Sequence, residues 1–156
     1  MAVLLVRHAK AGDRSRWSGD DQERPLSAPG REQAEALVAA IGHTPTLLVS
    51  SPYRRCIETL EPLGHAHGLL VGTDERLAED GDLEPALELL AAIPDGAVLC
   101  SHGDMIPMVI DALIRRGLEL TNAVPAVKKG SWFALERDGV SWTRATWFPA
   151  PRQDAE

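Results

Sequence analysis

Apolar and polar residues follow one another in blocks along this chain, and the blocks predict alternating strands and helices. Three short, largely apolar runs show no alternation: residues 2–6, 46–50 and 97–100. Such runs are typical of strands that are buried on both faces of a parallel sheet. Between them, apolar residues recur every three or four positions, which is the spacing of an amphipathic helix. The pattern therefore predicts parallel βα units.

The predicted helices cover residues 26–42, 83–93 and 105–116, and a fourth begins near residue 51. Ser27 has the N-cap residue type, and Gly42 is a suitable C-terminal stop. Ser51 and Pro52 have the signature of an N-cap and first helical position, so they predict where the fourth helix begins. Pro62 predicts a bend or an end of that helix.

The remaining segments predict one further short strand, a hairpin and two loops. Residues 69–71 form a short strand, and an acidic loop follows it. Asp138-Gly139 is a hairpin turn between strands 131–136 and 140–147. Residues 13–25 are polar and charged, and a loop of that length inside a domain is often functional. We expect a single domain over 1–149 and a frayed tail over 150–156.

Composition narrows the partners of this domain. The chain has 156 residues and a net charge of −7, which argues against nucleic acid and anionic membranes as partners. No apolar run approaches the roughly 20 residues that cross a bilayer, and we see no signal peptide. Cys56 and Cys100 lie far apart in predicted core elements, so we expect reduced, buried thiols in a cytoplasmic protein. The sequence does not predict an oligomeric state.

Cationic and imidazole side chains follow the predicted strands at their carboxyl ends. The first strand ends in Arg7-His8, and the third ends just before His102. The helix after the second strand carries Arg55 in its first turn. Parallel βα units bring these ends to one edge, where open α/β sheets bind ligands. Two imidazoles and two guanidiniums around one point predict a phosphoryl site.

The same residues carry a resemblance to the histidine phosphatase superfamily, which includes the phosphoglycerate mutases. Arg7-His8-Ala9 is similar to its first motif, with alanine where most members have glycine. The other matching segments are residues 26–34 (LSAPGREQA), 51–59 (SPYRRCIET) and 101–103 (SHG). The short chain and residues 21–26 (DQERPL) most resemble SixA-type phosphohistidine phosphatases, and also the phosphatase domain that is joined to some Nudix hydrolases. The resemblance implies a three-layer α/β/α sandwich with a mostly parallel central sheet, phosphoglycerate mutase-like.

Catalytic roles also follow from this resemblance. It implies that His8 is the nucleophile and that Arg7, Arg55 and His102 hold the phosphoryl oxygens, with Gly103 beside them. Glu79 aligns with the family's general acid, although Asp80 is adjacent. A neutral imidazole is a competent nucleophile, and fixed cations can stabilise phosphoryl transfer. We therefore expect neither a metal nor a cofactor.

The substrate stays open between a phosphohistidine protein and a phosphorylated small molecule such as a nucleotide or sugar phosphate. Arg14 and Trp17 on the long loop, and Lys129 near the hairpin, are candidate contacts for the leaving group. A solvated loop and a surface turn are the competing interpretations of these residues. A catalytically silent, phosphate-sensing or protein-binding module is the competing function, because a fold alone does not prove activity.

Other phosphate chemistries do not fit the sequence. A cysteine phosphatase needs Arg six residues after its Cys, but Pro62 and Ile106 occupy those positions. A Nudix-like spacing of glutamates around Arg31 lacks the required glycines. His65 and His67 have no carboxylate or cysteine partner in the sequence pattern, which makes them weak metal ligands.

Overall fold

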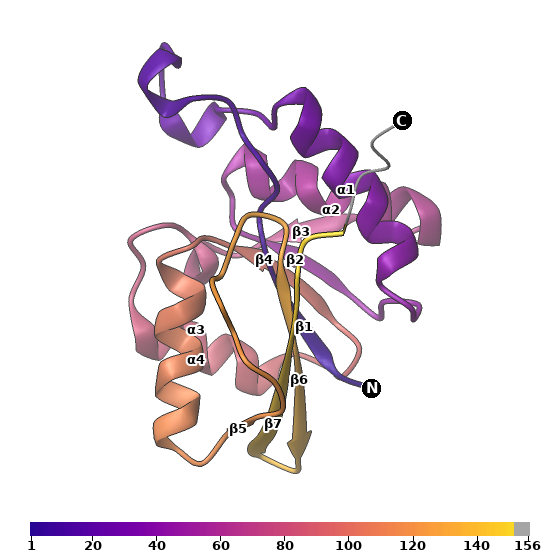
Figure 1. Ribbon diagram of the computed structural model, residues 1–156, viewed down its shortest axis with the longest axis vertical. Helices are drawn as coiled ribbons and strands as arrows, with labels where there is room; N and C mark the ends of the chain where they lie inside the picture. Colours follow the sequence, from indigo (N-terminus) through magenta and orange to yellow (C-terminus); the bar gives the residue numbers. More distant parts are fainter. Residues whose placement is uncertain (152–156) are drawn as a thin grey trace.

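A seven-stranded mixed sheet forms the centre of the computed structural model, which describes residues 1–151 (Figure 1). The strands are β1 Val3–Arg7, β2 Leu48–Ser50, β3 Val71–Thr73, β4 Val98–Ser101, β5 Glu119–Leu120, β6 Trp132–Asp138 and β7 Ser141–Phe148. Their order in the sheet is β3-β2-β4-β1-β6-β7-β5. The first four in this order are parallel, β6 is antiparallel to β1 and β7, and β5 is parallel to β7. The sheet is mostly parallel, as predicted.

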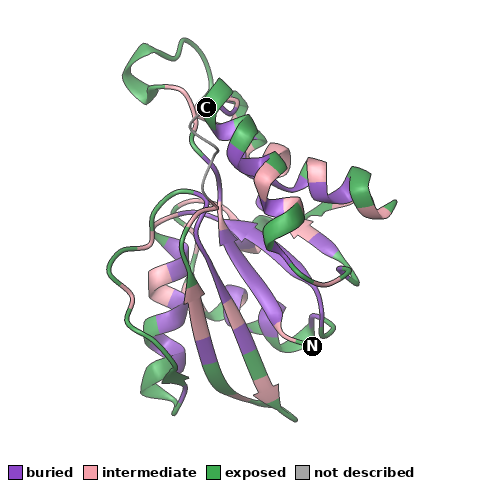
Figure 2. Ribbon diagram, turned by 45° about the vertical axis from the view of Figure 1, so that its right-hand side comes forward, coloured by how far each residue is buried: buried purple, intermediate pink, exposed green. Residues whose placement is uncertain are grey.

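Helices cover both faces of this sheet. They are α1 Ala28–Ala40, α2 Arg54–His67, α3 Leu83–Ala92 and α4 Met105–Arg115. Along β1, Leu4 and Val6 pack with α1 and α2, whereas Val3 and Leu5 pack with α3 and α4. The central strands are buried on both faces (Figure 2), which explains the unbroken apolar run in the sequence. The three-layer α/β/α sandwich is therefore confirmed.

One predicted helix limit is wrong, and it has a local reason. Helix α2 begins at Arg54, with Tyr53 rather than Ser51 at the N-cap, because the Ser51 hydroxyl is hydrogen-bonded to His102 instead. Of the bend or end predicted at Pro62, the end does not occur. The helix continues to His67, and its C-cap is Gly68, whose φ of 67° is the left-handed conformation of many C-caps.

Two strands also differ from the predicted pattern. Strand β3 covers Val71–Thr73, two residues later than predicted, because its register with β2 pairs Val71 with Leu48. Strand β5 was not predicted, since it has only two residues and both are exposed.

The long loop over residues 13–25 contains two short turns of 3-10 helix, Arg14–Arg16 and Asp21–Glu23. Asp13 and Asp20 cap these turns by accepting hydrogen bonds from backbone N–H groups two residues later. An isolated bridge between Ala11 and Leu26 closes the loop at its base. The loop extends beyond the end of the sheet at the top of Figure 1. It is thus held in a defined shape beside the carboxyl ends of the strands.

The two cysteines are free and buried, as expected. No helix within residues 1–151 is long and apolar enough to cross a membrane. Of the tail predicted over 150–156, residues 152–156 lie outside the described residues.

Candidate active site

Three parallel strands bring the predicted site residues together. Arg7 at the end of β1 pairs in register with Ser101 at the end of β4. His8 and His102 each follow directly, and their ring centroids are 5.5 Å apart in an edge-to-face arrangement. Strand β2 ends beside them and leads into Arg55 on the first turn of α2. The predicted meeting of strand ends is confirmed.

His8 is held as a neutral imidazole with a free Nε2. Its Nδ1 lies 2.7 Å from the backbone oxygen of Ala9, and since a carbonyl can only accept, Nδ1 carries the hydrogen. Burial, together with the nearby charges of Arg55 and Arg7, lowers the pKa of His8 to about 3. The unprotonated Nε2 is therefore available as a nucleophile at neutral pH.

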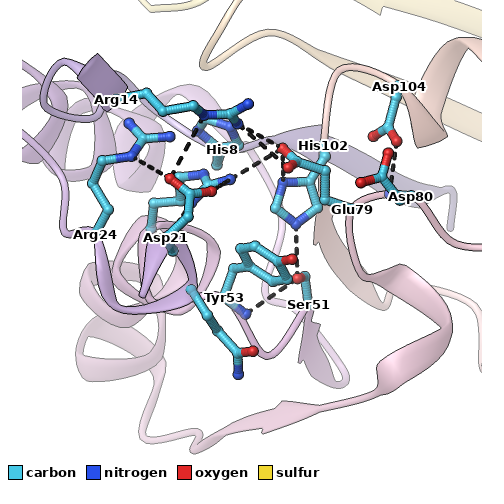
Figure 3. Close-up of polar contacts among 12 residues, drawn as sticks. His8, Arg14, Asp21, Arg24, Ser51, Tyr53, Glu79, Asp80, His102 and Asp104 are labelled. Atoms are coloured by element: carbon cyan, nitrogen blue, oxygen red, sulfur yellow. Dashed lines mark hydrogen bonds and ion pairs between the residues drawn. The ribbon is translucent and has the colours of Figure 1, made fainter. Parts of the chain in front are cut away.

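His102 is anchored through the opposite nitrogen. Its Nε2 lies 2.8 Å from the Ser51 hydroxyl, which also accepts a hydrogen bond from the backbone of Tyr53 (Figure 3). The Tyr53 ring packs against the imidazole at a centroid distance of 4.7 Å. The Nδ1 of His102 is buried and has no hydrogen-bond partner within the described part of the chain. It lies 3.7 Å from the Glu79 carboxylate.

Arg55 is fully buried, and its guanidinium is held by acidic groups from two loops. Nη1 donates to the backbone oxygen of Asp21 at 2.9 Å, and Nη2 lies 3.1 Å from both the Asp21 and Glu79 carboxylates. The guanidinium also stacks over the Tyr53 ring at 4.8 Å. A cation in a helix's first turn opposes the helix dipole, and the two carboxylates account for its position here.

Arg7 is fixed by the backbone around it. Its Nη1 donates to the Val127 oxygen at 2.6 Å, while its buried Nε has no hydrogen-bond partner among residues 1–151. A Cβ added at Gly103 would lie 2.6 Å from the Arg7 Cζ, so only glycine lets the guanidinium lie there. This close approach gives a physical reason for the glycine of the Ser101-His102-Gly103 motif.

Glu79 rather than Asp80 lies next to His102. Its carboxylate contacts Arg14 at 3.0 Å and Arg55 at 3.1 Å, beside the His102 contact described above. Asp80 has a positive φ of 62° and lies beside Asp104 on the cavity wall, where its backbone N–H donates to the Asp104 carboxylate at 2.8 Å. Of the two adjacent carboxylates, Glu79 has the geometry of the candidate general acid.

Asp21 is a site residue that was not predicted individually. Its carboxylate lies 2.9 Å from Arg24, 3.1 Å from Arg55 and 3.6 Å from Arg14 (Figure 3). Partial burial raises the pKa of Asp21, but the Arg24 hydrogen bond and the arginine charges outweigh it and hold that pKa below its usual value. The sequence signals at this position were the segment of residues 21–26 (DQERPL), which begins at Asp21, and the opposite charges of Asp21 and Arg24 three residues apart.

These residues surround an open cavity of about 750 Å³. The sequence-predicted residues that line it are Arg7, His8, Arg14, Glu79, Gly103 and Lys129. Arg55 and His102 are not among the lining residues, but both lie next to Glu79, which is. Trp17 lies outside: it borders a separate hollow of about 250 Å³, and its indole N–H donates to the Asp20 backbone oxygen at 2.8 Å. The structure therefore brings all but one of the predicted residues together.

Sequence comparison agrees with this geometry. The model of the histidine phosphatase superfamily, branch 1, matches residues 3–86, which is more than half of the chain and includes His8, Arg55 and Glu79. The chain belongs to the histidine phosphatase superfamily. In this family context the Ala9 departure leaves the site intact, since the Ala9 backbone both anchors His8 and donates to Thr59 at 2.9 Å.

Individual members of the superfamily show the range of relatives. The 8-oxo-(d)GTP phosphatase of Mycolicibacterium smegmatis is 36% identical over 144 residues, covering 88% of this chain and 45% of that protein. This chain thus spans less than half of that relative. A SixA protein histidine phosphatase bound to tungstate has a TM-score of 0.69 at 20% identity, with 95% and 94% of the two chains covered. A mycobacterial glucosyl-3-phosphoglycerate phosphatase bound to inorganic phosphate has a TM-score of 0.63 at 22% identity, with 96% of each covered. These structural matches confirm the fold.

Oxyanions are the ligands that this histidine phosphatase site suits. One buried nitrogen of each of three residues lacks a hydrogen-bond partner in the described chain: Nε of Arg7, Nε of Arg55 and Nδ1 of His102. These residues come from the three adjoining strand ends. Within residues 1–151, no three or more His, Cys, Asp or Glu side chains are grouped so as to hold a metal ion.

Proposed function

We propose that this protein is a metal-independent phosphatase that passes a phosphoryl group from its substrate to His8 and then to water. The observation that carries the proposal is the state of His8. Its Nδ1 is tied to the Ala9 oxygen and its pKa is lowered to about 3, so Nε2 keeps a free lone pair beside fixed cations.

In the first step, Nε2 of His8 attacks phosphorus, and the bond from phosphorus to the leaving group breaks. Arg7, Arg55 and His102 stabilise the charge on the three other phosphoryl oxygens, as fixed donors do in phosphoryl transfer. Protonated Glu79 gives its proton to the leaving atom. The products are the phosphorylated His8 and the free leaving group.

In the second step, water attacks phosphorus and breaks the bond to Nε2 of His8. The Glu79 carboxylate takes one proton from that water, so it ends in the form that began the cycle. Inorganic phosphate leaves, and His8 is neutral again. This second half mirrors the first, with the same residue serving as acid and then as base.

For the substrate, we propose a nucleotide or a related phosphorylated small molecule. The support is the 36% identity to the 8-oxo-(d)GTP phosphatase, although that name describes a protein of which this chain matches less than half. The fold shared with SixA supports a phosphohistidine protein as the second candidate. A panel of nucleotides, sugar phosphates and phosphohistidine protein would rank them.

Rapid-quench labelling tests the mechanism. With ³²P-labelled substrate, the wild-type protein should yield acid-labile, base-stable phosphate on the chain, and His8→Ala should yield none. Labelling and turnover should both persist in EDTA, because the cations supply the charge that a divalent ion provides elsewhere.

Either of two results would overturn this mechanism. One is labelling that persists in His8→Ala, and the other is activity that EDTA abolishes and a divalent ion restores. A wild-type protein that binds phosphate but turns over no ester, nucleotide or phosphohistidine substrate would instead identify a phosphate-sensing module. Circular dichroism of His8→Ala serves as the control for folding.

A further inference from the structure

A second hollow of about 630 Å³ adjoins the active site, and the charged side chains that line it within residues 1–151 are all cations. Its cations are Arg7, Lys10, Lys128 and Lys129. No Asp or Glu lines it among residues 1–151, although acidic residues outnumber basic ones by 23 to 16 in the whole chain. The active-site cavity is different, because Asp13, Glu79, Asp80 and Asp104 share its walls with the arginines. An anion is therefore the ligand that this second hollow suits.

Buried hydrogen bonds hold the lysine-bearing segments in place. Gln33 on α1 is 6% exposed, and its side chain accepts from the Lys10 backbone at 2.9 Å and donates to the Lys129 oxygen at 3.4 Å. Helix α1 can come this close because residue 30 is glycine: a Cβ there would lie 1.7 Å from the Lys10 oxygen. Two separate segments are thus fixed to one helix, with a lysine on each.

The hollow is also tied to the nucleophile. The Gly130 N–H lies 3.1 Å from the backbone oxygens of both Arg7 and His8, so the Lys128–Lys129 turn is attached to the end of β1. Arg7 and Lys129 line both the active-site cavity and the second hollow. Burial lowers the pKa of Lys129, and the charges of Arg7, Arg24, Arg14 and Arg55 lower it further, which shows how positive this junction is.

An apolar surface lies beside the cations. The hollow is also lined by Pro125, Trp147 and Pro149. The Trp147 backbone is fixed by a pair of hydrogen bonds with Asn122, at 2.9 Å each. Lysines beside an indole and prolines suit a ligand that combines an anionic group with a ring.

We propose that this second hollow is a leaving-group subsite that binds a second phosphate next to the one being transferred, as in a nucleoside diphosphate. This rests on the proposed function for the transferred phosphoryl group at His8. The second phosphate would lie on Lys10 and Lys128, with the ring of the ligand toward Trp147.

Binding and turnover together test the subsite. The double variant Lys10→Gln/Lys128→Gln removes two exposed cations of the hollow, and Arg115→Gln/Arg144→Gln removes two exposed cations elsewhere as a matched control. In a His8→Ala background, calorimetry should show inorganic diphosphate binding at least ten-fold more weakly to the lysine variant. Orthophosphate affinity should change by a much smaller factor, because a single phosphate needs only the active-site cavity.

Kinetics supply the second readout in the catalytically intact protein. The ratio of kcat/KM for ADP to that for p-nitrophenyl phosphate should fall at least ten-fold in the lysine variant and stay within two-fold in the arginine control. Equal losses of diphosphate affinity in both variants, or none in either, would overturn the subsite. If His8 is not labelled but the lysine variant still binds diphosphate more weakly than the arginine control, the proposed mechanism is overturned and the subsite stands.

Discussion

Strands β1 and β4 end at the paired residues Arg7 and Ser101, and a histidine follows each of them. The two histidines, His8 and His102, are nevertheless anchored through different ring nitrogens. His8 is tied at Nδ1 by the carbonyl of Ala9, its own neighbour in the chain. His102 is tied at Nε2 by Ser51, which comes from the end of a third strand. Each imidazole is therefore left with its other nitrogen available to a ligand.

This difference gives a physical reason for the two roles that the family resemblance implies. A carbonyl anchor requires Nδ1–H, and so it leaves a lone pair on Nε2 of His8. A hydroxyl can also donate, so the Ser51 contact at Nε2 allows the hydrogen of His102 to lie on Nδ1, where it would donate to a phosphoryl oxygen in the proposed mechanism. In the proposed mechanism, the partner of the anchored nitrogen thus distinguishes the histidine that attacks from the one that stabilises charge.

Substituting each histidine by glutamine should have the largest effects and tests whether His8 and His102 have different roles. His8→Gln should lower kcat by on the order of 10⁴-fold, because it removes the nucleophile. His102→Gln should lower kcat by about 10²-fold, the usual cost of losing one charge-stabilising donor. Quenched-flow labelling should still detect phosphoenzyme in His102→Gln. Label lost only in His102→Gln would reverse the two roles.

Acid stability tests the neutral state of His8. Its pKa is about 3 in the folded protein against 6.5 for an ordinary histidine. The unfolded chain therefore binds the proton first, and the stability that His8 contributes is lost as pH falls from 6.5 toward 3. Between pH 7 and pH 5 this costs about 2 kcal/mol of unfolding free energy.

Urea denaturation of the wild type and His8→Gln at both pH values measures this loss. The decrease in unfolding free energy should be smaller by that amount in the variant, which has no group to titrate at this position. Equal decreases in the two proteins would show that His8 is not held neutral by burial.

The smallest effect should come from the anchor of His102. Ser51→Ala removes a buried hydroxyl whose hydrogen bond contributes about 1 kcal/mol, so kcat should fall about five-fold. Nitrogen-15 NMR of the imidazoles should show the His102 Nε2 signal shifting while the His8 signals stay in place. A shift at both histidines, or at neither, would show that Ser51 does not position His102 specifically.

Much of this site could be predicted because burial dictates the strands. An unbroken apolar run must be a strand covered on both faces, and a polar residue just after it then lies at the sheet edge. That logic places His8, His102 and Arg55 together from the sequence alone, and the family resemblance adds Glu79 and Gly103. The register between neighbouring strands and the packing of helices on both faces then fix the positions of these residues.

What escaped prediction depends on contacts between segments that no local pattern records. Ser51 has a good N-cap sequence, but its hydroxyl is hydrogen-bonded to a residue 51 positions away. Asp21 lies in a polar loop without periodicity, and its role follows only from the arginines that fold onto it. Trp17 was grouped with the site by its place in that loop, whereas the turn at Asp20 holds its indole outside the main cavity.

The position of Glu79 would affect the release of inorganic phosphate, the product of the proposed reaction. Its carboxylate contacts Arg14 and Arg55 and approaches His102, the last two being the groups assigned here to phosphate. In the proposed cycle, Glu79 is protonated when hydrolysis ends. Once it releases that proton to solvent, its carboxylate is held beside these groups and would compete with inorganic phosphate for them, which would favour product release even where free phosphate is abundant. Loss of the negative charge in Glu79→Gln should accordingly make orthophosphate a stronger inhibitor in steady-state assays.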